Sequence, residues 1–530
     1  PGSCRASGSP APSMASASIP QAGRTPAGAI VHDEKIALPP IIQGGMGAGV
    51  SWWYLANAVS RAGQLGVVSG TALDLILARR LQDGDPEGHC RRAMEHFPFP
   101  EMSRRILDKY FISGGRKPGQ PYKGVLMHSL KAPRPAQELC IVSNFVEVFL
   151  AKEGHDGPVG INYLEKIQLP HLPSMYGAML AGVTAVLMGA GIPKDVPGVL
   201  DAYVNHQPAE YKLNVTGAAA GDDMKMRFDP REFMECELPP LPRPWFLPII
   251  ASNTLAVTLM KKSNGKIHGF IIEGPTAGGH NAPPRGKLTL TDDGQPIYGE
   301  RDVVDLEEIA KLGLPFWVAG SAARPEKLRE VLAIGGTGIQ VGTAFAFCEE
   351  SGMTAEYKDR LIRKAMERRA VIFTDAVASP TGFPFKVALL ENTISEKEIY
   401  LQRKRVCDLG YLRESYKKED GTVGYRCASE PVEHYVQKGG TAEGTEGKKC
   451  LCNSLMANIG MPQVTKDGTE ELPLITCGDD LLELDRFLPP GKPTYAAVDV
   501  INQLLEGIEH SAVNRRPVGV TIGTWDSENL

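Results

Sequence analysis

The sequence predicts an α/β protein: a (β/α)8 TIM barrel with a helical insertion after the second strand and a C-terminal extension. Two observations predict this fold. Eight short apolar segments alternate with amphipathic helical segments over residues 34–388, as parallel strands alternate with helices in a barrel. Nearly all of these apolar segments end in glycine, at the point where a barrel carries its functional loops.

The expected strands are short, apolar and rich in β-branched residues. In order they are Leu38–Met46, Leu65–Ser69, Pro158–Leu164, Val183–Met188, Phe246–Ala251, His268–Ile272, Pro315–Ala319 and Gly338–Val341. A helix is expected after the first strand, with Ser51 as its N-cap and Gly63 as its stop. The rival fold, a doubly wound open sheet, would have a Gly-x-Gly-x-x-Gly turn that opens a helix directly, and residues 44–49 match that pattern only loosely.

The chain divides into three parts by composition. Residues 1–33 are interpreted as a cloning remnant before Met14 followed by a flexible N-terminus rich in Ala, Ser, Gly and Pro. Residues 34–388 form the expected barrel, and residues 389–530 form the extension. Within the barrel, residues 75–156 are expected to be an insertion with helices over 75–97, 102–111 and 136–151, because no short βα unit fits them. This insertion is a candidate roof for the site, with a purely structural addition as the alternative.

The composition predicts a soluble globular protein of the cytoplasm. The 530 residues carry a net charge of −5 and are 42% hydrophobic, and no dense basic run indicates nucleic acid as a partner. No signal-peptide pattern is expected at the N-terminus, and the scattered cysteines fit a reducing compartment. The apolar run Met175–Ile192 contains glycines and ends at Pro193, so we interpret it as helix, turn and strand, not as a membrane span.

A Gly-Gly-His loop follows the sixth expected strand. Gly278 and Gly279 have no Cβ, so the backbone there can approach a flat or anionic group closely. His280 can exchange a proton near neutral pH. The loop therefore indicates the rim of a cofactor site, and the alternative is a glycine-rich turn with an incidental surface histidine.

The ends of the last two expected strands form a candidate phosphate site. Barrels frequently bind a phosphate there through backbone N–H groups. Gly320, Gly342 and Thr343 offer bare backbone and one hydroxyl. The alternative is that these glycines only permit tight turns where the barrel closes.

Four cysteines lie close together in the sequence of the extension: Cys407, Cys427, Cys450 and Cys452. Four thiolates in one compact segment are able to bind zinc or an iron–sulfur cluster. Their spacing is poor for a zinc ribbon, which prefers Cys-x-x-Cys pairs, so four ordinary thiols remain the alternative.

Five motifs together resemble the nitronate monooxygenase (2-nitropropane dioxygenase) family, which is related to the FMN-dependent enoyl-acyl-carrier-protein reductases. They are PIIQGGM at Pro40–Met46, GIN at Gly160–Asn162, AGGH at Ala277–His280, VAG at Val318–Gly320 and GIQVGTAF at Gly338–Phe345. The resemblance implies a flavoprotein oxidoreductase with FMN that oxidises alkyl nitronates or nitroalkanes with O2. The alternative is an NAD(P)H-dependent enoyl-thioester reductase, with an acyl carrier protein as partner. The oligomeric state, including a homo-oligomer, stays open.

The resemblance also implies roles for individual residues, with His280 as the catalytic histidine. The implied cofactor-binding residues are Gly44, Gly45 and Met46 against the flavin ring, Asn162 as a hydrogen-bonding group, Gly278, Gly279 and Gly320 as close neighbours, and Gln340, Gly342 and Thr343 at the phosphate. Glu273 stands where the family usually has glutamine, and its charge would repel an anionic flavin or nitronate unless Arg285 or Lys166 pairs with it. Residues 379–386 are expected to reach back over the site.

Overall fold

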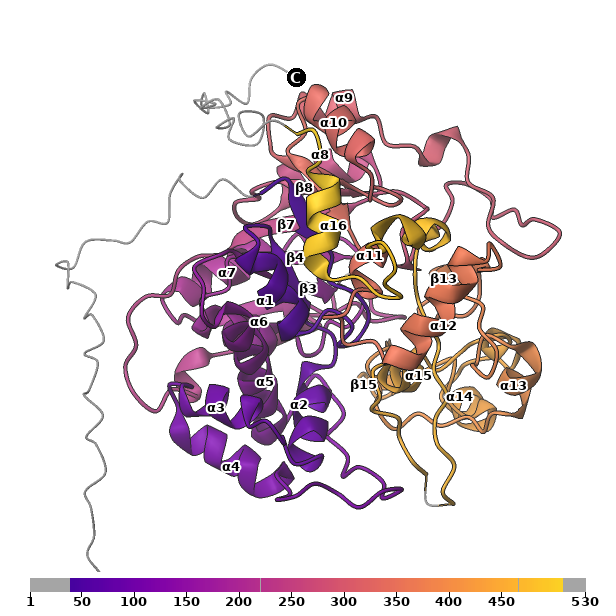
Figure 1. Ribbon diagram of the computed structural model, residues 1–530. Coiled ribbons are helices and arrows are strands. Elements are labelled where there is room, and N and C mark those ends of the chain that lie inside the picture. The colour runs from indigo at the N-terminus through magenta and orange to yellow at the C-terminus, as the bar shows by residue number, and fades with distance from the viewer. Residues whose placement is uncertain (1–38, 220, 466, 509–530) are drawn as a thin grey trace, which may run out of the picture.

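The computed structural model describes residues 39–219, 221–465 and 467–508, and it contains one eight-stranded parallel sheet (Figure 1). The expected flexible stretch 1–33 lies outside the described residues. The sheet strands are β1 Ile41–Gln43, β2 Gly66–Ser69, β3 Val159–Leu164, β4 Ala185–Gly189, β7 Trp245–Ile250, β8 Phe270–Glu273, β10 Phe316–Ala319 and β11 Gly338–Val341. Each falls within or beside a segment that the sequence predicted as a strand.

The sheet closes on itself in chain order, which confirms the (β/α)8 barrel. Its strand order is β1-β11-β10-β8-β7-β4-β3-β2. The two ends meet because Ile42 in β1 forms a parallel bridge with Leu65, the residue before β2, and Gln43 N–H donates to the Leu65 carbonyl at 2.9 Å. The barrel is filled by its own inward side chains, among them the fully buried Trp317, whose Nε1–H donates to the Pro39 carbonyl at 3.1 Å.

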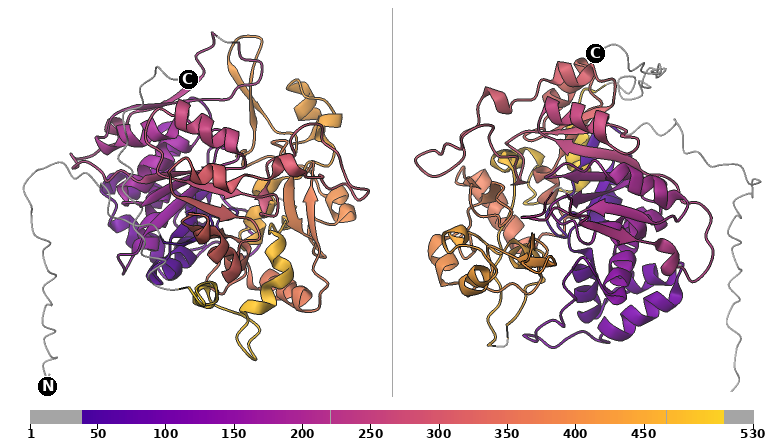
Figure 2. Two further views of the ribbon diagram at one scale, coloured as in Figure 1. Left: turned by 90° about the horizontal axis from the view of Figure 1, so that it is seen from above. Right: turned by 180° about the vertical axis from the view of Figure 1, so that it is seen from behind.

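Helices surround the barrel and extend beyond it (Figure 2). They are α1 Trp53–Arg61, α2 Leu73–Gln82, α3 His89–Glu95, α4 Pro100–Tyr110, α5 Arg134–Lys152, α6 His171–Leu180, α7 Val196–Val204, α8 Asn253–Lys262, α9 Leu306–Ala310, α10 Pro325–Ala333, α11 Thr343–Ala346, α12 Ala355–Met366, α13 Lys397–Gln402, α14 Val432–Gln437, α15 Leu451–Asn458 and α16 Ala497–Leu504. The apolar run at 175–192 is the end of α6, a turn and β4, as expected. No helix of the described part of the chain is both long and apolar enough to cross a bilayer.

Two expectations for helices are wrong. The helix expected over 75–97 is interrupted, because the backbone at Gly84, Asp85 and Gly88 takes positive φ angles of 92°, 43° and 72°. Ser51 does not cap α1. Its hydroxyl donates to the Gly44 carbonyl and accepts from Met46 N–H, both at 2.9 Å, so it orders the loop after β1 instead.

Between β2 and β3 lie four helices, α2 to α5, of which α5 packs between α1 and α6. This is the place of an ordinary barrel helix, and the buried face of α5 supplies much of the core on this side. No residue of 75–156 lines the main cavity described below. The insertion therefore packs on the side of the barrel and does not roof the cavity.

The chain after the barrel forms small elements beside the carboxyl ends of the strands (Figure 1). Two short antiparallel strands, β12 Ile372–Asp375 and β13 Phe385–Ala388, extend a sheet that also contains β9, residues Gly279–His280 of the Gly-Gly-His loop. The hairpin β14 Glu414–Lys417 and β15 Val423–Arg426 follows. The last helix, α16, returns to pack on α1 and α10. A further antiparallel pair, β5 Ala209–Lys212 and β6 Lys225–Phe228, lies before β7.

Candidate active site

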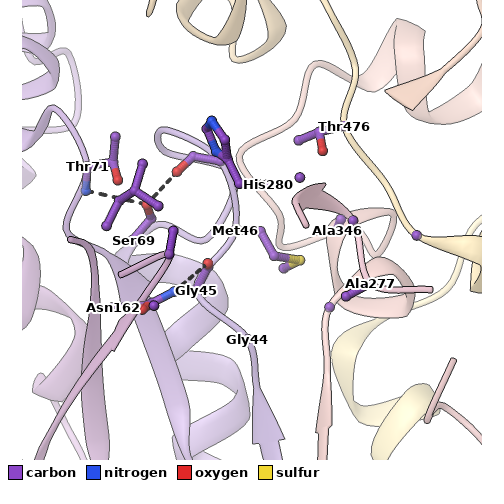
Figure 3. Close-up of a pocket in the computed structure, with 18 of the residues that line it drawn as sticks. Gly44, Gly45, Met46, Ser69, Thr71, Asn162, Ala277, His280, Ala346 and Thr476 are labelled. Atoms are coloured by element: carbon purple, nitrogen blue, oxygen red, sulfur yellow. Dashed lines mark hydrogen bonds between the residues drawn. The ribbon is translucent and has the colours of Figure 1, made fainter. Parts of the chain in front are cut away.

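A cavity of about 220 Å³ opens at the carboxyl ends of the barrel strands, and the next largest of the described cavities holds about 30 Å³. Residues at the end of each of the eight barrel strands line it. In a (β/α)8 barrel this is the end where active sites are built. The large cavity is therefore the candidate active site (Figure 3).

The structure brings every barrel residue of the predicted site to this one cavity. Those residues are Gly44, Gly45, Met46, Asn162, Glu273, Gly278, Gly279, His280, Gly320, Gln340, Gly342 and Thr343. The four cysteines of the extension are separate from this set, although Cys452 also lines the cavity.

Three glycines of the lining have no room for a side chain. A Cβ on Gly45 would stand 2.4 Å from Asn162 Cβ, and one on Gly278 would stand 2.5 Å from the backbone carbon of Cys477. Gly320 has φ of +93°, which disfavours any side chain, and its Cβ would meet Thr276 at 2.8 Å. Close packing of the protein itself therefore requires glycine at these three positions, and the cavity is lined there by bare backbone.

Two residues that line the cavity have a buried amide oxygen with no hydrogen-bond partner in the described part of the chain. Asn162 Nδ2 donates to the Gly45 carbonyl at 3.0 Å, which fixes the amide and leaves its Oδ1 unpartnered (Figure 3). Gln340 Oε1 is also buried and unpartnered, and the Gln340 side chain lies against Gly44. Buried acceptors are rarely left unsatisfied, so these two atoms indicate a ligand with N–H or O–H donors.

His280 lies at the rim of the cavity, on the short strand β9. It pairs with Phe385 of β13, and the two rings meet edge to face with centroids 4.9 Å apart. Its Nε2 lies 2.8 Å from Ser379 Oγ, in the segment that was expected to reach back over the site, and this confirms that expectation. Burial, and then the charge of Lys166, lowers the pKa of His280 to about 4, so the imidazole is neutral at pH 7.

Glu273 ends β8 with its carboxyl group at the cavity. It has no ion pair within the described part of the chain: Lys166 lies 4.8 Å over the Phe383 ring, and Arg285 donates to the Ala251 carbonyl. Burial raises the pKa of Glu273 to about 7. The carboxyl group is therefore substantially protonated near neutral pH and offers an O–H donor, much as the amide of the family's glutamine offers an N–H.

Thr343 stands at the candidate phosphate site, at the start of α11. Its hydroxyl accepts a hydrogen bond from Gly478 N–H at 2.8 Å and keeps its own proton to donate. Gly320, Ser321 and Gly342 line the cavity on the same side. The loops of β10 and β11 thus meet as the sequence predicted, with the extension above them.

The extension supplies much of the cavity lining that sequence reasoning missed. These residues are Tyr411, Leu412, Leu451, Cys452, Leu455, Thr476, Cys477, Gly478 and Asp480. Only the short run of Cys477, Gly478 and two aspartates indicated a part in the site, because it resembles the glycine-rich strand ends of the barrel. The sequence of this run does not indicate that it contacts residues more than a hundred positions earlier.

Comparison with known proteins finds a family similarity in one part of the barrel. Residues 245–381 match the family model described as nitronate monooxygenase. The nitronate monooxygenase of Pseudomonas aeruginosa is 31% identical over 117 residues, which are 22% of this chain and 31% of that protein. The matched part thus spans about a third of the curated relative.

Solved structures with a similar barrel share little sequence with the chain. FabK from Thermotoga maritima is 17% identical, with a TM-score of 0.43 over 88% of this chain and 92% of that one. Nitroalkane oxidase from Streptomyces ansochromogenes is 15% identical, with a TM-score of 0.41 over 88% and 96%. The enoyl reductase domain of MlnA from Bacillus amyloliquefaciens is 12% identical, with a TM-score of 0.43 over 88% and 94%. Likenesses of this degree establish nothing about function.

The fold and the cavity define a (β/α)8 barrel protein with a large cavity at the carboxyl ends of its strands. The segment 245–381, which carries β7, β8, β10, β11 and the Gly-Gly-His loop, is similar to the nitronate monooxygenase family. This match agrees with the resemblance and includes three of its five motifs, AGGH, VAG and GIQVGTAF.

Proposed function

We propose that the chain is an FMN-dependent oxidoreductase that oxidises alkyl nitronates, with His280 at the substrate. One observation carries the proposal. A neutral histidine and two unpartnered buried amide oxygens, of Asn162 and Gln340, line one cavity whose walls are bare backbone. The match of residues 245–381 to the nitronate monooxygenase family model supports the same conclusion.

The residues present fit FMN. A flavin ring is flat and carries an imide N–H, so it suits glycine walls and unpartnered amide oxygens. The Gln340 side chain lies against Gly44. We therefore propose that Gln340 contacts the flavin ring and not the FMN phosphate. The phosphate then lies at Gly320, Gly342 and Thr343, where backbone N–H groups and one hydroxyl are available.

When bound, FMN would supply the electron transfer from substrate and the subsequent reaction with O2. The chain's own residues position the substrate and keep water out. A neutral imidazole with a pKa of about 4 is a weak base, so His280 is poorly suited to remove a carbon-bound proton from a nitroalkane. It is better suited to hydrogen-bond an anion that has already lost that proton.

The charge around His280 also favours an anionic substrate. The Lys166 ammonium group is close enough to depress the pKa of His280, and its positive charge would attract a nitronate. Glu273 adds little repulsion while it is protonated. We therefore propose the nitronate, and not the neutral nitroalkane, as the substrate.

Anaerobic absorbance titration tests this function. We expect the purified protein to show flavin bands, or to take up added FMN, and to lose its oxidised-flavin absorbance when propyl nitronate is added. His280→Ala should lower the rate of this bleaching by tenfold or more, while His96→Ala, which removes an exposed histidine outside the cavity, should leave it unchanged. A wild-type rate in His280→Ala would contradict the assignment, and failure to bind FMN would contradict the cofactor.

Enoyl-thioester reduction is the second candidate function, and one observation favours it. The extension gives the cavity an apolar wall of Leu412, Leu451 and Leu455, which would suit an acyl chain. In that case NADH or NADPH alone should bleach the flavin rapidly, and an acyl carrier protein would present the substrate. Slow bleaching by both nucleotides, with fast bleaching by the nitronate, would favour the first candidate.

A further inference from the structure

Ser379 and Thr381 form a hydrogen-bonded turn beside His280, in the connection between β12 and β13. Ser379 is fully buried, and its Oγ lies 2.8 Å from His280 Nε2 and 2.8 Å from Thr381 Oγ1. Thr381 N–H donates to the same Oγ at 3.2 Å. Three groups therefore meet at one serine hydroxyl, and their arrangement decides which ring nitrogen of His280 carries the proton.

Backbone and side-chain bonds hold this turn against His280. The strand β13 pairs with β12 along one edge and with β9, which carries His280, along the other. The extension adds two bonds: Lys448 Nζ donates to the Ser379 carbonyl at 3.0 Å, and Lys449 N–H donates to the Ala378 carbonyl at 2.9 Å. Ser379 is thus fixed at hydrogen-bond distance from the imidazole by the fold itself.

The number of donors and acceptors favours one position for the His280 proton. A serine hydroxyl has one proton to donate and two lone pairs that accept, and one lone pair of Ser379 accepts Thr381 N–H. If the Thr381 hydroxyl donates to the second lone pair, the Ser379 proton is left for His280 Nε2, and every hydroxyl proton of the group has an acceptor.

The reverse order of donors satisfies the group less well. His280 Nε2–H would then donate to Ser379, and the Ser379 hydroxyl would donate to Thr381 Oγ1. The Thr381 proton would be left without an acceptor in the part of the chain that the structure describes. Since polar groups at a largely buried site are rarely left unpaired, the first order is favoured.

The first order gives His280 a donor to offer the cavity. The neutral imidazole carries one proton, so acceptance at Nε2 places that proton on Nδ1. Nδ1 makes no hydrogen bond within the described ranges and is not one of their fully buried unpartnered atoms, while the side chain lines the cavity. An N–H donor suits the oxygen of an anion, whereas a lone pair would suit removal of a carbon-bound proton.

We propose that Ser379 is a positioning residue that holds His280 with its proton on Nδ1, so that the site binds a nitronate and does not deprotonate a nitroalkane. The identity of the anion rests on the proposed function, whereas the position of the proton follows from the hydrogen bonds of the chain. Thr381 supports this arrangement through its N–H and its hydroxyl. The Ser379 proton stays on its oxygen throughout, and no bond is formed or broken at this residue.

Nitrogen NMR of the full chain with isotope-labelled histidine tests the position of the proton, because protonated and unprotonated ring nitrogens have well separated chemical shifts. Spectra are recorded at pH 7 with and without added FMN, and the His280 signals are identified by their loss in His280→Ala. We expect a protonated Nδ1 and an unprotonated Nε2 in the wild type. Ser379→Ala should shift a large part of the population to the other tautomer.

Thr393→Val is the matched control for the loss of a buried hydroxyl. Thr393 is fully buried and forms a turn of the same geometry, in which its Oγ1 lies 2.8 Å from Ser395 Oγ and accepts Ser395 N–H at 3.2 Å. Neither residue lines the cavity. This variant should leave the His280 signals as they are in the wild type.

Binding of nitrate gives a second readout that needs no turnover. Nitrate has the planar, anionic oxygens of a nitronate but no carbon to oxidise, and its affinity can be measured from the shift of the His280 signals. We expect Ser379→Ala to bind nitrate about fivefold more weakly than the wild type, as loss of one well-placed hydrogen bond predicts. The KM for propyl nitronate should rise by a larger factor than kcat falls, and Thr393→Val should change none of these values.

Two results would overturn the proposal. One is a wild type with its proton on Nε2, which can be measured even if thermal melting shows that Ser379→Ala does not fold. The other is a folded Ser379→Ala with the tautomer and the nitrate affinity of the wild type. If His280 carried its proton on Nδ1 and bound nitrate but the protein did not oxidise a nitronate, the proposed function would fail while the role of Ser379 would stand.

Discussion

The N–H of Gly478 donates a hydrogen bond to Thr343 Oγ1 at 2.8 Å, across 135 residues of sequence. This bond joins the loop after the last barrel strand to the extension. A second bond, from Asp479 N–H to the Thr276 carbonyl at 3.1 Å, joins the same segment to the loop of the Gly-Gly-His motif. The extension is therefore the roof of the candidate phosphate site.

Thr343→Val should weaken FMN binding and lower stability together. The valine keeps the shape but removes the hydroxyl, which leaves the buried Gly478 N–H without an acceptor at a cost of about 1–3 kcal/mol. We expect a lower melting temperature and at least a fivefold higher Kd for FMN, measured by fluorescence quenching. Thr258→Val, on the exposed face of α8, should change neither value. An unchanged Kd in Thr343→Val would show that the phosphate lies elsewhere.

Gly278→Ala should open the contact between the barrel and the extension. Its Cβ would meet backbone atoms of Cys477 and Gly478 at 2.5 and 2.7 Å, which cannot move aside as a flexible side chain can. We expect weaker FMN binding and faster proteolysis of the extension. Gly274→Ala is the matched control in the same loop, because its Cβ would meet the Ala319 carbonyl oxygen at an ordinary 3.6 Å. Equal behaviour of the two variants would contradict the close contact.

Glu273→Gln should stabilise the protein at high pH. Burial raises the pKa of this carboxyl group from 4.5 to about 7, so the folded state holds its proton while the unfolded state loses it between those values. The free energy of unfolding of the wild type therefore falls as pH rises from about 4.5 to 7 and stays constant above 7. The total loss of stability is of order 3 kcal/mol.

The glutamine variant lacks this titration, so its advantage should grow between pH 5 and pH 8. Denaturant unfolding of both proteins at the two pH values measures it, and Glu506→Gln, at an exposed carboxylate, serves as control. An advantage that is the same at pH 5 and pH 8 would show that Glu273 is ionised in the folded protein.

The barrel, and the end of it that carries the candidate site, could be predicted because each strand and the glycine after it form a short local sequence pattern. An apolar run followed by glycine marks a strand end, and in a closed parallel barrel all such ends meet at one rim. The family resemblance assigned Gly45, Asn162 and His280 to one site, and their places at strand ends agree with that assignment without knowledge of their distances. The return of residues 379–386 to the site was also expected, and Ser379 Oγ lies 2.8 Å from His280 Nε2.

The roof of the site could not be predicted in this way. It depends on contacts of Cys477 and Asp479 with the loop after β8, which join residues about 200 positions apart and leave no periodic pattern in the sequence. The insertion was the more obvious candidate because of its size, but α5 is needed as a barrel helix between α1 and α6. The interruption at Gly84 was predictable, because residues 83–88, DGDPEG, combine glycine, proline and aspartate as turns do.

Tyr411→Phe should destabilise the protein without changing the shape of the cavity. The Tyr411 hydroxyl donates to Asp74 Oδ1 at 2.7 Å, while His128 Nε2 lies 3.0 Å from Oδ2 of the same buried carboxylate. Burial by itself would raise the pKa of Asp74, but His128 and Tyr411 outweigh it, and the pKa is lowered. Loss of the phenol donor should therefore cost about 1–3 kcal/mol.

This cost should be present at neutral pH, where Asp74 is ionised in both folded and unfolded states. It should shrink as pH falls through the lowered pKa of Asp74, because a protonated carboxyl group needs the donor less. Urea unfolding of Tyr411→Phe at pH 7 measures the cost, and Tyr54→Phe, at an exposed tyrosine, should behave as the wild type. FMN affinity should be retained, because the ring that lines the cavity is kept. Equal stability of Tyr411→Phe and the wild type at pH 7 would show that the bond between the extension and α2 contributes nothing to folding.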